Sequence, residues 1–177
     1  MEDRLGTKTS VMGPKWRDEG GTIRCSVLSQ GMTGEKWIEY FENRGGFFCN
    51  ETKKVLLSPR FTPTLGVQTE LAIFKSALLP PNERYTLSAN EMGHMKGLVT
   101  PRIEVTFLLR EKFSNKELEE MGLWWIAIMH APVRSFKESL ISLCVDRYGD
   151  KEWISAHGAK DYDSWNSEGG FAYKIPS

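Results

Sequence analysis

A seven-residue apolar run, Leu-Trp-Trp-Ile-Ala-Ile-Met at 123–129, stands out in the pattern of hydrophobic and polar positions. It contains no polar alternation, and a short run of this kind is typical of a strand buried on both faces of a sheet. His130 and Pro132 follow the run, so the chain is expected to turn there. The pattern therefore places the centre of the hydrophobic core at 123–129.

Capping residues predict four short helices. Thr33 and Asn50 are each an N-cap in front of a segment with apolar residues, and Ser88 and Ser114 each begin a Ser-x-x-Glu capping box. Each helix is expected to end at or before a helix-terminating residue. In chain order these residues are Gly45, Pro59, Gly97 and Gly122.

Alternating and continuous apolar segments predict further strands at 22–29, 66–75 and 103–109. From residue 139 onward nearly all of the chain is predicted as strand, at 139–146, 152–156 and 170–175, with a turn at 148–151. Successive short strands are typical of a β-meander. The chain is therefore predicted to be a single α+β domain, with a mainly antiparallel sheet, about four short helices on one face and a C-terminal β-meander.

Residues 1–21 differ from the rest, because they are rich in polar residues and glycine and end in a Gly-Gly pair. They predict a flexible or late-docking N-terminal arm in front of a domain at 22–177. Trp16 is an exception in this arm, because an indole there is expected to pack on the body of the protein or on a partner.

Composition excludes several classes of protein. The chain lacks a signal-peptide pattern and a long apolar segment, so the cytoplasm is the expected location. Lys plus Arg (23) balance Asp plus Glu (23), which argues against non-specific binding to nucleic acid. A local patch of basic and aromatic residues would still allow it. Its candidate residues are Arg102, Arg110, Lys112, Arg134 and Arg147.

Cysteine and histidine spacing predicts no cofactor and no metal. Cys25, Cys49 and Cys144 form no Cys-x-x-Cys pair, so small buried hydrophobic side chains are expected there. His94, His130 and His157 would form a metal site only if folding brought them together, because their spacing matches no zinc motif.

Aromatic residues of the C-terminal segment carry the first functional hypothesis. Tyr162, Trp165, Trp153 and Tyr173 are expected to form an aromatic surface that makes this a non-catalytic binding protein with an unknown ligand. Adjacent residues of a strand point to opposite faces, so Trp124 and Trp125 cannot both lie under the helices. An uncovered indole would then require either a homodimer or another protein partner, or a covering segment such as the arm with Trp16.

The alternative hypothesis is a small hydrolase or transferase. His130 would lie at the end of the central strand as a general base, and Arg134 would hold an anionic group of the substrate. This hypothesis requires an accessible imidazole with a carboxylate or a nucleophile within hydrogen-bond distance.

Overall fold

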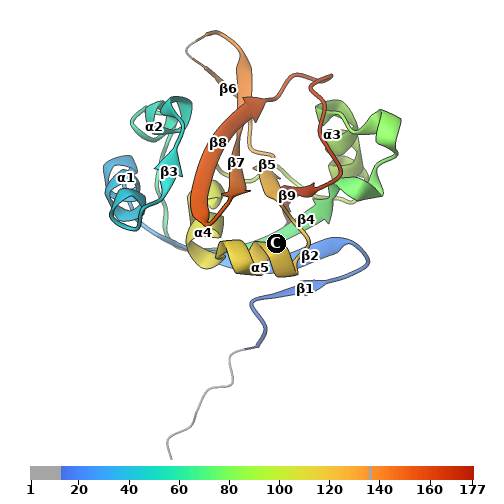
Figure 1. The fold of residues 1–177 in the computed structure, drawn as a ribbon, viewed down its shortest axis with the longest axis horizontal. Coiled ribbons are helices and arrows are strands. Elements are labelled where there is room, and N and C mark those ends of the chain that lie inside the picture. The colour runs from blue at the N-terminus through green and yellow to red at the C-terminus, as the bar shows by residue number, and fades with distance from the viewer. Residues whose placement is uncertain (1–12, 136) are drawn as a thin grey trace, which may run out of the picture.

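The computed structural model describes residues 13–135 and 137–177, which form a nine-stranded mixed sheet and five α-helices (Figure 1). The strand order is β1-β2-β4-β9-β5-β7-β8-β3, and β6 pairs with β7. Most neighbouring strands are antiparallel, so the α+β prediction is confirmed. The strands are β1 (Trp16–Asp18), β2 (Thr22–Gln30), β3 (Phe47–Phe48), β4 (Leu65–Lys75), β5 (Trp125–Ile128), β6 (Val133–Arg134), β7 (Leu140–Tyr148), β8 (Lys151–Gly158) and β9 (Gly169–Lys174).

The predicted central strand is confirmed. All residues of β5 are buried, and the strand lies between β9, to which it is parallel, and β7, to which it is antiparallel. Both edges of β5 are therefore paired and both of its faces are covered. This explains why its sequence has no polar alternation.

Four helices cover the first face of the sheet. They are α1 (Gly34–Asn43), α2 (Asn50–Leu56), α4 (Val105–Lys112) and α5 (Asn115–Glu120). Their apolar side chains, among them Trp37 of α1 and Phe107 of α4, pack with Ile126, Ile128 and Val145 of the sheet in the larger hydrophobic core. Four helices thus lie on one face, but only α1, α2 and α5 are among the predicted helices. The helix predicted from Ser88 is α3, which lies on the other face.

A smaller core lies on the second face, under α3 (Thr86–Met95) and the segment 159–168. Its main side chains are Phe74, Trp125, Phe171 and Tyr173, and α3 contributes Ala89. In Figure 1, α3 lies beside β9, on the opposite side of the molecule from α1 and α2. The covering of this face reaches Cys144 of β7 and His157 of β8, and a hollow lies nearer the turn of the β7–β8 hairpin.

One predicted strand is wrong. Residues 103–109 contribute to helix α4, in which Val105–Arg110 are all buried. A helix that is buried around most of its circumference has no polar face, so its sequence shows a continuous apolar run instead of helical periodicity. The β-branched residues Ile103, Val105 and Thr106 made the run resemble a strand.

Helix α3 begins at Thr86, two residues before the predicted cap at Ser88. The amide groups of Thr86 and Leu87 donate to the carbonyl oxygens of Asp163 and Asp161, at 3.1 and 2.9 Å. A distant loop therefore satisfies the first turn of the helix, a role that a side-chain cap usually has.

The two ends of the described chain join the sheet. Residues Trp16–Asp18 pair with β2, and Trp16 packs against the larger core; residues 1–12 of the predicted arm lie outside the described residues. Strands β7 and β8 form a hairpin, whereas β9 lies between β4 and β5. Among the described residues, no helix is long and apolar enough to cross a lipid bilayer.

Candidate functional site

The aromatic residues predicted to form one surface lie in different environments. Tyr173 is buried, its hydroxyl donates to Asn90 Oδ1 at 2.8 Å, and its ring stacks on Phe74. Tyr162 is exposed, with its ring 6.3 Å from that of Tyr85. The structure therefore does not bring Tyr162 and Tyr173 to one surface.

Trp165 forms part of the smaller core. Its ring centroid lies 4.8 Å from that of Trp125 and 5.6 Å from that of Phe171, and its Nε1–H donates to Thr86 Oγ1 at 3.0 Å. The ring that covers Trp125 is therefore that of Trp165. Trp16 of the N-terminal arm packs against the core on the other face of the sheet. The ring of His157 lies beside Trp165, with 5.6 Å between centroids.

A hollow of about 460 Å³ opens on the second face of the β7–β8 hairpin. The pairing of Cys144 with Ser155 and of Asp146 with Trp153 places alternate side chains of both strands on this face. Trp165 of the 159–168 segment reaches the ring of His157, and toward the hairpin turn these side chains face open space. The residues that line the hollow are Asp146, Arg147, Tyr148, Trp153, Ser155 and His157.

Trp153 forms a supported aromatic wall of this β7–β8 hollow. Phe47 of the edge strand β3 stacks on it, with ring centroids 5.5 Å apart and an interplanar angle of 11°. Tyr148 lies on its other flank at 6.0 Å and is largely exposed. Stacking on Phe47 limits the movement of the Trp153 indole, so the wall exists before any ligand arrives.

Asp146 supplies the acidic group of the hollow. Its Oδ2 accepts a hydrogen bond from the Ser155 hydroxyl, and its Oδ1 lies 3.9 Å from Nε2 of His157. Burial raises the pKa of the Asp146 carboxyl, against the opposing effects of Ser155, His157 and Arg110. Arg110 approaches from α4 and donates to the main-chain oxygen of Asp146, not to its carboxylate.

The order of these groups does not suit a serine nucleophile. In a Ser-His-Asp arrangement the imidazole lies in the middle and takes the proton of the serine hydroxyl. Here the carboxylate of Asp146 lies in the middle, because Ser155 donates to it directly and His157 faces its other oxygen. The arrangement presents an acceptor to the hollow and is suited to binding a donor or a cation.

His130 is held by the backbone on both sides of its ring. The imidazole is buried, its Nδ1 donates to the carbonyl oxygen of Ala131 at 2.8 Å, and its Nε2 accepts from the amide of Leu143 at 3.0 Å. Burial lowers the pKa of His130 and favours this neutral form. A general base needs a free nitrogen that faces a substrate proton, so the geometry supports a structural role.

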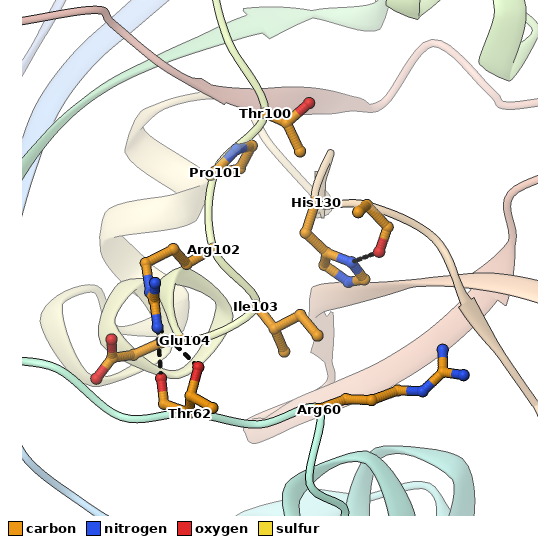
Figure 2. A pocket seen from close by; sticks show the side chains of 9 residues that line it. Arg60, Thr62, Thr100, Pro101, Arg102, Ile103, Glu104 and His130 are labelled. Atoms are coloured by element: carbon orange, nitrogen blue, oxygen red, sulfur yellow. Dashed lines mark hydrogen bonds between the residues drawn. The ribbon is translucent and has the colours of Figure 1, made fainter.

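Figure 2 shows a smaller hollow, of about 210 Å³, in front of His130. Arg102 Nη2 donates to both the carbonyl and the hydroxyl oxygen of Thr62, and Glu104 accepts from Thr64, so these polar groups satisfy one another. Arg134, the predicted anion contact, does not line this hollow. It lies exposed on β6, where it donates to the carbonyl oxygen of Glu138.

The three histidines considered as metal ligands do not form a cluster. His94 and His130 line one hollow of about 340 Å³ under α3, whereas His157 lines the β7–β8 hollow. Within 13–135 and 137–177, no three His, Cys, Asp or Glu side chains are arranged to hold a metal ion.

The basic residues considered for nucleic-acid binding are engaged separately. Arg110 is buried and donates to the carbonyl oxygen of Phe113, and Lys112 donates to that of Ser26. Arg147 donates to Leu123 O and lies over the Trp124 ring. Nothing in these contacts places Arg102, Arg110, Lys112, Arg134 and Arg147 on one common face.

Sequence reasoning missed Asp146 and Ser155, and treated His157 only as a metal candidate. A signal was available in the turn at 148–151, because Tyr148 pairs with Lys151 around a two-residue loop. Such a loop sets the register of the hairpin. Counting back from it places Asp146 opposite Trp153.

The chain matches no protein-family model, no curated protein and no solved structure. The geometry of the sites is therefore the basis for any functional assignment.

Proposed function

We propose that this is a non-catalytic binding protein whose ligand occupies the β7–β8 hollow. The observation that carries the proposal is that Trp153 and Asp146, paired across the hairpin, face the same open space. The indole offers a flat apolar surface, and the carboxylate offers an acceptor to donor groups of the ligand. Binding pockets commonly combine these two features.

The contacts of Ser155 and His130 favour binding over catalysis. Ser155 donates to Asp146 and not to an imidazole, and both nitrogens of His130 are engaged by backbone groups. These contacts leave neither residue arranged as a nucleophile with its base.

Of the four aromatic residues expected to form a surface, Trp153 alone lines the hollow, and Trp165 lies at its border beside His157. Trp165 and Tyr173 pack in the smaller core, so their contribution is to hold the sheet face in place. Tyr162 is exposed, but it does not line the hollow.

The test compares two alanine variants in saturation-transfer NMR, with choline and N-acetylglucosamine as probes. Trp153→Ala removes the wall of the hollow, and Trp124→Ala removes an exposed indole outside it. We expect at least one probe to bind the wild type and the Trp124 variant, and to lose its signal with the Trp153 variant. Binding that survives in a folded Trp153→Ala protein, or no binding of either probe to the wild type, would overturn the proposal.

A further inference from the structure

We infer that the ligand of the β7–β8 hollow is a small organic cation, such as an alkylated ammonium group. The inference rests on the proposed function and names its ligand class. It is drawn from the contacts of the Asp146 carboxylate, from the aromatic rings around it and from the positions of the neighbouring cations.

The Asp146 carboxylate has no full cationic partner at its oxygens. Among the described residues, no lysine or arginine forms an ion pair with it, and the nearest ionisable nitrogen is Nε2 of His157 at 3.9 Å. Arg147, next in the chain, pairs with Glu119 at 3.5 Å. A partly buried carboxylate without such a partner is stabilised by a ligand that brings a positive charge.

Two aromatic rings line the same hollow as this carboxylate. Trp153 and Tyr148 both line the hollow, with their rings 6.0 Å apart and inclined by 49°. The face of an aromatic ring carries a negative electrostatic potential and attracts a cation within about 6 Å. The hollow therefore combines two inclined rings with one carboxylate, and these groups suit an alkylated ammonium group in charge and in apolar surface.

The chain uses the same interaction immediately beside the hollow. Nζ of Lys151 lies 4.4 Å from the centroid of Phe47, the ring that stacks on Trp153, and the Arg147 guanidinium lies 4.3 Å from that of Trp124. In the part of the chain that the structure describes, no such cation lies over Trp153 or Tyr148. The position over these two rings is therefore open to a cation from a ligand.

The size of the hollow is compatible with such a ligand. Its volume of about 460 Å³ falls within the roughly 300–1,000 Å³ typical of small-molecule pockets.

The experiment titrates the full chain with choline and with 3,3-dimethyl-1-butanol by calorimetry. The two compounds have nearly the same shape, but the second has a neutral tert-butyl group in place of the ammonium. We expect choline to bind about tenfold more tightly or better, as an ammonium group between aromatic rings and a carboxylate requires. Asp146→Asn, in which the amide oxygen still accepts from Ser155, should remove this difference.

Equal affinity for the two compounds, or unchanged choline affinity in a folded Asp146→Asn protein, would overturn the inference. Binding of N-acetylglucosamine without choline would overturn the inference of a cationic ligand but keep the proposed function, whereas binding of neither would overturn both.

Tyr148→Ala changes an exposed ring and should keep the fold. It is expected to lower choline affinity several-fold, and an unchanged affinity would contradict the inference.

Discussion

The indole of Trp165 lies over the indole of Trp125, with their ring centroids 4.8 Å apart. Both rings are also tied by hydrogen bonds, Trp165 Nε1–H to Thr86 and Trp125 Nε1–H to Asn166. The pair joins the loop before β9 to both the central strand and α3. Trp165, which the sequence suggests as part of a binding surface, therefore packs against the smaller core instead. It lies at the border of the open hollow, beside His157.

Replacing Trp165 should destabilise the fold, whereas replacing Tyr162 should not. Trp165→Ala removes the ring that covers Trp125, so we expect the free energy of unfolding to fall by about 2–4 kcal/mol. Tyr162 is exposed, and Tyr162→Ala should change it by less than about 0.5 kcal/mol. Urea denaturation measures both variants. Equal effects would contradict the assignment of Trp165 to the core.

Gly93 of α3 should not tolerate alanine. A Cβ atom at this position would lie 2.7 Å from Cζ of Tyr173, whose buried ring cannot move away freely. Alanine normally stabilises a helix relative to glycine, but here the clash should cost about 1–3 kcal/mol. Thermal unfolding of Gly93→Ala, with Ser88→Ala in the same helix as the control, tests this. A stabilised Gly93→Ala protein would show that α3 lies farther from β9.

His130 should make the stability of the fold depend on pH. Because burial lowers the pKa of His130 in the folded state, the unfolded chain binds more protons. Stability should therefore decrease as the pH falls below about 6.5, the ordinary value for histidine. His130→Gln keeps an acceptor for the Leu143 amide and should flatten this dependence. Urea midpoints of both proteins across this pH range decide the matter, and parallel curves would argue against a buried neutral imidazole.

Cation binding should weaken in acid, through Asp146. Protonation of its carboxyl removes the negative charge, and burial raises the pKa so that this begins at a higher pH than for an exposed aspartate. The groups that face Asp146 are Ser155 and His157 of β8 and Arg110 of α4. A protonated His157 would repel a cation and act in the same direction, so choline is titrated against His157→Gln as well. A loss in acid that is absent in His157→Gln would assign it to the imidazole instead.

Local signals predicted much of the fold. Thr33 and Ser114 cap α1 and α5 as expected, because their hydroxyls accept from amides of the first helical turn. The run at 123–129 contains the central strand, because a strand paired on both edges and covered on both faces has no polar position. Residues 103–109 were assigned wrongly, because a buried helix and a buried strand have similar composition.

The candidate site was harder to predict than the fold, because the hollow exists only where no helix or loop covers the sheet. Trp153 was identified as an aromatic candidate, but its partner Asp146 appears in the sequence as one charged residue in an apolar strand. Only the register of the hairpin and the end of the 159–168 segment make the two face one hollow. The sequence did not reveal that His130 has a structural role, because the Leu143 amide that donates to its Nε2 belongs to another strand.

The indole NMR resonances report ligand binding in the β7–β8 hollow at single residues. Each tryptophan gives one Nε1–H signal, assigned by single Trp→Phe variants, and Trp124 is an internal control outside the hollow. On addition of choline we predict a saturable shift of the Trp153 signal, with little change at Trp124. A saturable shift at Trp124 while Trp153 stays unchanged would show that choline binds outside the hollow.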